Sequence, residues 1–121
     1  MVKRILIVDD ESDYLNLMSL SLKKNGYEIF IALDGEAAVE AVKEKKPDLI
    51  LLDVKMPGMN GHETLERIRK VRSGLDIPII FLTADSRYRS AEDVAHLSAQ
   101  GYFLKPFDSK ELLSKIRQCL G

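Results

Sequence analysis

The sequence predicts an α/β fold in which helices cover both faces of a parallel β-sheet. Two observations lead to this prediction. Short runs rich in β-branched residues alternate along the chain with amphipathic stretches at helical spacing. In addition, three of the short runs are apolar at consecutive positions, which is typical of strands that are buried on both faces. Strand–helix units that follow one another in this way join through right-handed crossovers and form a doubly wound sheet.

Five segments are expected to form the strands of this sheet. Each is a short run of β-branched, aromatic or other apolar residues, bounded by polar or turn-forming residues. The expected strands span residues 4–9, 27–32, 48–53, 77–83 and 101–105.

Five helices are expected, one after each strand. The first carries Leu15, Met18 and Leu22 at helical spacing and is followed by an Asn-Gly turn. Asp34 is a candidate N-cap of the second helix, and Ser90 begins a capping-box spacing at the start of the fourth. The second to fifth helices are expected within residues 34–47, 61–74, 90–101 and 108–120.

The size and composition of the chain restrict the classes of function. Its 121 residues fit one domain, 1–121, and its net charge of −1 argues against unaided nucleic-acid binding, which usually needs a basic face. The sequence shows no signal peptide and no apolar run long enough for a membrane span. The single cysteine, Cys119, excludes an internal disulfide framework, and the isolated His62 and His96 are expected to face solvent. We therefore expect a cytoplasmic domain that binds neither nucleic acid nor membrane.

Polar side chains follow four of the expected strands, each at the carboxyl end of its strand. Asp9 and Asp10 follow the first strand, Asp53 ends the third, Thr83 ends the fourth and Lys105 ends the fifth. Each could have a local role instead, because acids cap helices, short polar residues serve turns and a lysine can extend along apolar surface. Ligands of such sheets bind at the carboxyl ends of the strands, where the strand order reverses. A shared site therefore explains the five positions better than five separate accidents.

These residue types suggest phosphoryl transfer to a carboxylate. An aspartate can act as a nucleophile and form an aspartyl phosphate, and Asp53 is the candidate. Because both Asp53 and the incoming group are negative, their charge must be screened. Clustered carboxylate oxygens suit Mg²⁺, which would bridge the acids to phosphoryl oxygens. Lys105 would add a cationic contact, and the Thr83 hydroxyl would donate a hydrogen bond to a phosphoryl oxygen.

Four motifs make the chain resemble the receiver domain of two-component response regulators over essentially its whole length. They are VDDE at 8–11, LLDVKMPGMNGHE at 51–63, LTA at 82–84 and KPF at 105–107, and their order is highly specific. The resemblance, which extends to the chemotaxis receivers, implies a flavodoxin-like, doubly wound sheet of five parallel strands in the order 2-1-3-4-5, with five helices.

The resemblance also implies a role for each acidic residue. It makes Asp53 the phosphoacceptor and gives Asp10 and Asp53 as Mg²⁺ ligands. Asp9 would be a second acid that acts on the metal largely through water, and the backbone carbonyl of Lys55 would be a further ligand.

A signalling cycle follows from the same resemblance. The phosphoryl group would come from a sensor histidine kinase or a phosphotransfer domain. Thr83 and Lys105 match the hydroxyl and the lysine that act with Asp53 on the phosphoryl group, and Tyr102 matches the aromatic that changes rotamer on activation. The surface of the fourth helix, fifth strand and fifth helix would then control a downstream output protein or domain. A cis peptide bond is implied between Lys105 and Pro106.

Three classes of function remain open at this point. The leading one is a phosphorylation-dependent switch, a phosphoprotein of phosphorelay signalling that catalyses only its own phosphorylation and dephosphorylation. The second is a phosphatase of the haloacid dehalogenase type, which needs a second aspartate where this sequence has Lys55. The third is a constitutive protein-interaction module, which the complete set of site residues disfavours. The chain could be a stand-alone regulator or one domain of a longer protein.

Overall fold

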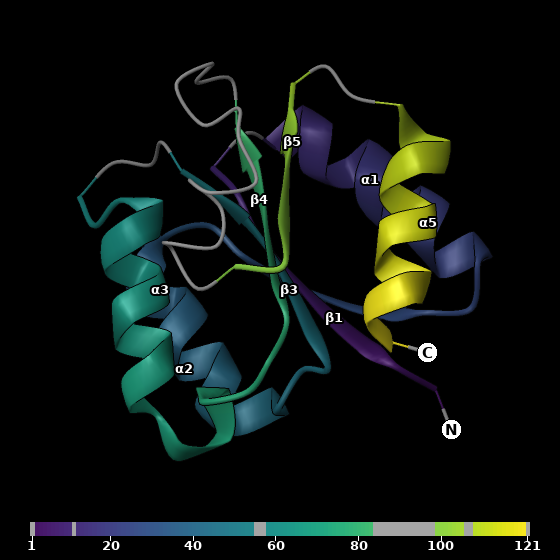
Figure 1. Ribbon diagram of the computed structural model, residues 1–121. Helices are drawn as coiled ribbons and strands as arrows, with labels where there is room; N and C mark the ends of the chain where they lie inside the picture. Colours follow the sequence, from purple (N-terminus) through teal and green to yellow (C-terminus); the bar gives the residue numbers. More distant parts are fainter. Residues whose placement is uncertain (1, 11, 55–57, 84–98, 106–107, 121) are drawn as a thin grey trace.

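A parallel sheet of five strands lies at the centre of the computed structural model, which describes residues 2–10, 12–54, 58–83, 99–105 and 108–120 (Figure 1). All five strands lie within the ranges expected from the sequence. Their order in the sheet is β2-β1-β3-β4-β5, so the predicted topology is confirmed. The strands are β1 (Arg4–Val8), β2 (Glu28–Ala32), β3 (Leu49–Asp53), β4 (Ile79–Thr83) and β5 (Gly101–Leu104).

Helices cover both faces of this sheet. Four of the five expected helices lie within the described residues, and residues 90–98 of the one expected within 90–101 fall outside them. Figure 1 shows α1 and α5 on one face and α2 and α3 on the other. The helices are α1 (Ser12–Lys24), α2 (Gly35–Lys45), α3 (Gly61–Lys70) and α5 (Ser109–Leu120), with a short 3₁₀ helix, η1 (Arg72–Gly74), after α3.

Side-chain caps fix the starts of α2 and α3. The Asp34 carboxylate accepts a hydrogen bond from the Ala37 N–H at 2.8 Å, which confirms the predicted N-cap. Asn60 caps α3 in the same way, because its side-chain oxygen accepts from the Glu63 N–H at 3.0 Å. The turn before α3 uses Gly58, whose φ of 76° favours glycine. The two helices therefore begin close to the carboxyl ends of β2 and β3.

Alternate strand residues build two hydrophobic cores, one on each face of the sheet. Leu6 and Ile50 pack in the cluster that contains residues of α2 and α3, whereas Ile5 and Leu51 pack in the cluster that contains residues of α1 and α5. Fully burying one such side chain stabilises the fold by about 1.5–3 kcal/mol. Because both faces are covered, the central strands β1 and β3 are apolar at consecutive positions, as the sequence indicated.

Within the described part of the chain, no helix combines the length and the apolar character that crossing a membrane requires.

Candidate functional site

Three aspartates meet where β1 and β3 end. β1 lies between β2 and β3, so Asp9 and Asp10 emerge next to Asp53, the last residue of β3. Asp9 is only 1% exposed, and its backbone N–H continues the sheet by donating to the Ala32 carbonyl at 3.2 Å. Asp53 is 5% exposed, whereas Asp10 is exposed to solvent. The sequence prediction that these acids converge at one edge of the sheet is confirmed.

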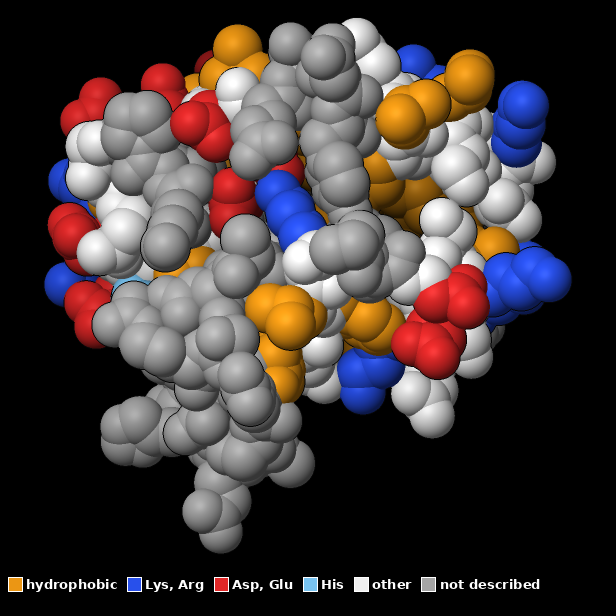
Figure 2. Space-filling view, turned by 90° about the horizontal axis from the view of Figure 1, so that it is seen from above, with side chains coloured by type: hydrophobic (Ala, Val, Ile, Leu, Met, Phe, Trp, Pro, Cys, Tyr) orange, Lys and Arg blue, Asp and Glu red, His pale blue; other side chains and the backbone are white. Residues whose placement is uncertain are grey.

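The three carboxylates are close enough to share a ligand. One oxygen from each of Asp9, Asp10 and Asp53 lies within 4.8 Å of the others. Figure 2 views the molecule from above this edge and shows acidic side chains gathered beside a basic one. Like charges at this separation repel, and burial strengthens the repulsion. The cluster therefore needs cationic partners.

Lys105 provides one such partner from the end of β5. Its ammonium Nζ lies 2.7 Å from Asp9 Oδ2 and 3.6 Å from Asp53 Oδ2. The lysine side chain is 11% exposed, so these contacts are largely shielded from water. Removing one member of a buried ion pair leaves the other charge uncompensated, at a cost of about 3–5 kcal/mol. Lys105 thus ties the fifth strand to the acids of the first and third.

The remaining charge fits a small divalent cation. Among the described residues, the cluster holds three carboxylates and the ammonium of Lys105. Mg²⁺ prefers carboxylate oxygens at about 2.1 Å, so two ligands on opposite sides of the ion lie about 4.2 Å apart. That span is comparable with the 4.8 Å spread of the three oxygens. The residues present therefore suit Mg²⁺ in donor type, charge and spacing.

A glycine lies directly against the backbone of Asp53. Gly61, the first residue of α3, donates its N–H to the Val54 carbonyl at 2.8 Å. A Cβ at position 61 would lie 2.5 Å from the Asp53 carbonyl oxygen, so a larger residue would displace the end of β3. The glycine at position 61 therefore allows the backbone of α3 to approach the end of β3 closely.

Tyr102 lies on β5, which β4 separates from the strand that carries Asp53. It is half-buried in β5, opposite Phe81 of β4, and packs against the core cluster that contains residues of α2 and α3. The ring of His62 meets Phe81 edge-on, with centroids 5.6 Å apart and planes at 88°. The expectation that His62 faces solvent was wrong, because this position of α3 turns toward the sheet and is half-buried.

Some expected site features lie beyond what the structure describes. Thr83 is the last residue of β4, so its backbone reaches the same edge of the sheet as Asp53. Its side chain, the Lys55 carbonyl and the bond between Lys105 and Pro106 fall outside the described residues.

The fold and the acidic site define a class of α/β signalling domains with an aspartate at the end of the third strand. The response regulator receiver domain family matches residues 5–117, and the chain belongs to this family. The resemblance inferred from the sequence is therefore confirmed.

Solved structures agree with this assignment. The chemotaxis response regulator CheY4 of Vibrio cholerae is 29% identical, with 99% of this chain and 100% of that chain covered and a TM-score of 0.89. The response regulator TrrA of Thermotoga maritima, solved in complex with Mg²⁺ and BeF, is 40% identical, with 98% and 100% covered and a TM-score of 0.86. The receiver domain of a sensor histidine kinase from Pseudomonas aeruginosa, which coordinates a magnesium ion in its active-site cleft, is 28% identical, with 100% and 99% covered and a TM-score of 0.89.

Proposed function

We propose that this receiver domain is a phosphorylation-dependent switch of a two-component system and that Asp53 is its phosphoacceptor. One observation carries the proposal. Asp53 is held nearly buried at the end of β3, with two further carboxylates and the Lys105 ammonium around it. An isolated turn aspartate would need none of these neighbours.

Phosphoryl transfer at this site would proceed by direct attack of Asp53. A carboxylate oxygen of Asp53 forms a bond to phosphorus, while the P–N bond of a phosphohistidine or the P–O bond of acetyl phosphate breaks. The electron pair leaves with the imidazole nitrogen or the acetate oxygen. Because Lys105 Nζ lies 3.6 Å from Asp53 Oδ2, it is placed to contact a phosphoryl group on Asp53. The domain would thus catalyse only its own phosphorylation and dephosphorylation.

Mg²⁺ is the cofactor that this proposal requires. The ligands would be Asp10, Asp53 and the backbone carbonyl of Lys55, with Asp9 acting largely through water. The different surroundings of the two neighbouring acids support this division, since Asp9 is buried against Lys105 whereas Asp10 is exposed. When bound, the ion would screen the negative charges of the acceptor and the phosphoryl group. Two similar domains carry magnesium in their solved structures, which supports the same choice here.

Activation would pass from the phosphoryl group to the surface formed by the helix expected within 90–101, β5 and α5. Thr83 would move toward the phosphoryl group, and Tyr102 would change rotamer into the space that it leaves. The position of Tyr102 against Phe81, next to the end of β4, supports this coupling. The change is a shift between two populated states, and it would control an output protein or domain.

The phosphodonor is proposed to dock on α1. Leu17 and Leu20 lie on the outer side of this helix and are 72% and 56% exposed. Exposed apolar side chains next to a reactive site favour contact with a partner, here a sensor histidine kinase or a phosphotransfer domain. The proposal includes the cytoplasmic location that the sequence predicts.

Labelling with a small phosphodonor tests the acceptor assignment. The parent protein, incubated with acetyl phosphate and Mg²⁺, should gain one phosphate by intact-mass analysis, and chelation of the metal should prevent the gain. Asp53→Asn should gain none, with Asp48→Asn, a change outside the acidic cluster, as the matched control that still labels. Labelling of Asp53→Asn at the parental level would overturn the assignment. Continuous turnover without a trapped phosphate would favour a phosphatase, and neither labelling nor turnover would favour an interaction module.

A further inference from the structure

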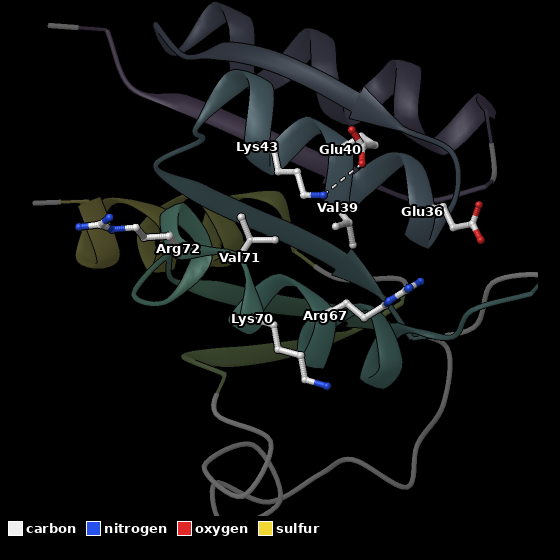
Figure 3. Close-up of a pocket in the computed structure, with 8 residues that line it drawn as sticks. All are labelled: Glu36, Val39, Glu40, Lys43, Arg67, Lys70, Val71 and Arg72. Atoms are coloured by element: carbon white, nitrogen blue, oxygen red, sulfur yellow. Dashed lines mark hydrogen bonds and ion pairs between the residues drawn. The ribbon is translucent and has the colours of Figure 1, made fainter.

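A groove lies between α2 and α3 (Figure 3). These two helices cover the sheet face opposite α1 and α5 (Figure 1). The volume of the groove is about 770 Å³. α2 contacts both α3 and η1, and at the start of α2 there is no room for a Cβ on Gly35 against Thr64 and Met59. The groove is lined by Glu36, Val39, Glu40 and Lys43 of α2, and by Arg67, Lys70, Val71 and Arg72 from α3 to η1.

The two walls of the groove differ in charge. The wall from α3 to η1 presents three exposed cations, Arg67, Lys70 and Arg72, for which the described part of the chain shows no ion pair. The α2 wall is mixed, because Glu40 pairs with Lys43 at 3.3 Å. The wall from α3 to η1 therefore carries only positive charges, whereas the α2 wall carries two acids and one lysine.

In the described ranges of the chain, Arg67, Lys70 and Arg72 make no side-chain hydrogen bond or ion pair. Arg69, by contrast, ties α3 to the backbone that follows it. Its guanidinium donates to the Gly74 carbonyl at 2.9 Å and to the Ile77 carbonyl at 2.6 Å. Arg69 is half-buried, and burial lowers the pKa of its guanidinium, an effect that the charge of Asp76 partly offsets. The neighbouring Arg67 is exposed and makes no comparable contact among the described residues.

Two valines form an apolar floor between the charged walls. Val39 and Val71 lie between the two helices in Figure 3. Both are half-buried and pack against the core cluster below them. The floor is therefore fixed by the core, and it can accept an apolar side chain from outside.

We propose that this groove is a docking site for an acidic, amphipathic helical segment of a partner protein. Arg67 and Lys70 are three residues apart on α3, which places them about 4.5 Å apart along the helix axis. Carboxylates three or four residues apart on a partner helix are neighbours at a similar spacing and would face this wall. An apolar side chain between them would pack on Val39 and Val71, and a basic residue on the other side would meet Glu36.

The mixed charge of the groove selects against other anionic partners. A nucleic acid or an anionic membrane presents negative charge on all sides and would meet Glu36 and Glu40 on the α2 wall. The net charge of the chain, −1, gives no general attraction to such polyanions. A peptide can place its acids on one side only, so it is the partner that matches both walls.

Docking here does not depend on the proposed phosphorylation. The groove is lined by α2, α3 and η1, whereas the acids and Lys105 lie at the carboxyl ends of β1, β3 and β5. The segment would therefore bind with and without a phosphoryl group, and also to Asp53→Asn. A failure of this inference can thus be told apart from a failure of the acceptor assignment.

A synthetic peptide tests the proposal by fluorescence anisotropy. The probe is a labelled peptide of about 16 residues, enough for about four helical turns, with glutamates at i, i+3 and i+4 positions on one face and one leucine between them. The matched peptide carries glutamine in place of glutamate. The groove variant is Arg67→Glu/Lys70→Glu, and the control variant is Lys23→Glu/Lys110→Glu, which changes the net charge by the same amount on the opposite face.

The glutamate peptide should bind the parent and the control variant with affinities within about twofold, and the groove variant at least about tenfold more weakly. Amide resonances of residues 36–43 and 67–72 should shift on binding, and circular dichroism should show that both variants are folded. Absence of binding to the folded parent, equal losses in the two variants, or equal binding of the glutamine peptide would overturn the proposal. Tighter binding of single-stranded DNA or of phosphatidylserine vesicles, lost in the groove variant, would assign the groove to that partner instead.

Discussion

The carboxyl edge of the sheet and the groove between α2 and α3 both concentrate charge, but they differ in burial. At the edge, Asp9 and Lys105 are removed from water and meet at 2.7 Å. In the groove, Glu40 and Lys43 also pair, at 3.3 Å, with both side chains more than half exposed. Buried pairs are costly to break, whereas exposed pairs contribute about 0–1 kcal/mol. Similar residue types therefore hold the fold together at one place and remain available to a partner at the other.

The end of α3 repeats this contrast within one turn of helix. Arg69 turns inward and donates to two backbone carbonyls, whereas Arg67 stays exposed. The two arginines have the same intrinsic chemistry, so the difference comes from the direction in which the helix presents them. Substitutions that remove a charge from a buried position and from an exposed position should therefore differ in their effect on the free energy of unfolding.

The largest effect is expected for Lys105→Met. This change keeps the length of the side chain but leaves the Asp9 and Asp53 carboxylates without their ammonium partner. The free energy of unfolding, measured with urea at neutral pH, should fall by about 3 kcal/mol. Added Mg²⁺ should recover part of the loss, because it would stabilise the same carboxylates in the folded state.

Lys70→Met is the control for this prediction, since Lys70 is exposed at the groove. Its free energy of unfolding should change by no more than about 0.5 kcal/mol. Equal losses in the two variants, or no response of Lys105→Met to Mg²⁺, would contradict the account of the acidic edge.

An intermediate effect is expected for Arg69→Met. The Gly74 and Ile77 carbonyls would lose a charged donor, which should lower the free energy of unfolding by about 1–2 kcal/mol. The matched change Arg67→Met removes the same group from an exposed position and should cost less than about 0.5 kcal/mol. Thermal or urea unfolding of the pair measures both. If Arg67→Met proved the more damaging, the division of roles at the end of α3 would be wrong.

The smallest effect on stability is expected for Leu17→Ser, which lies outside both charged regions. Because Leu17 is 72% exposed, the free energy of unfolding should stay within about 0.5 kcal/mol of the parent. Phosphoryl transfer from the cognate kinase should nevertheless slow several-fold, while labelling by acetyl phosphate stays unchanged. Leu75→Ser, which removes a leucine that follows η1 and is 57% exposed, is the control. A parallel slowing of both reactions would point to damaged folding and against docking on α1.

The sequence predicted the sheet and the acidic edge because both depend on local patterns. Consecutive apolar residues marked buried strands, and Asp9, Asp10 and Asp53 stood at strand ends that a parallel sheet must bring together. The ion-pair partner of Lys105 could not be predicted from local sequence patterns. Its contact with Asp9 joins residues 96 positions apart, and its distance depends on how five strands twist and pack.

Other features were not predicted, either because they depend on how separate elements pack or because their sequence signal was overlooked. The groove arises from the lateral separation of α2 and α3, for which single helices carry no signal. The Asn60 cap did have a sequence signal that was overlooked, since Asn60 and Glu63 show the spacing of a capping box. His62 lies three residues before the buried Leu65, so the helical period placed it toward the core.

The ion pair between Lys105 and Asp9 also bears on the order in which the parts of the protein fold. Its partners come from the first and the last strand of the chain, so it closes only when β1, β3, β4 and β5 are aligned. Contacts of such long sequence separation form late, because the entropy of closing the loop is lost before they can form. An unfinished chain would already carry Asp9, Asp10 and Asp53, but it would lack Lys105. Under the proposed function, competence to receive a phosphoryl group would therefore report that β1, β3, β4 and β5 have been aligned.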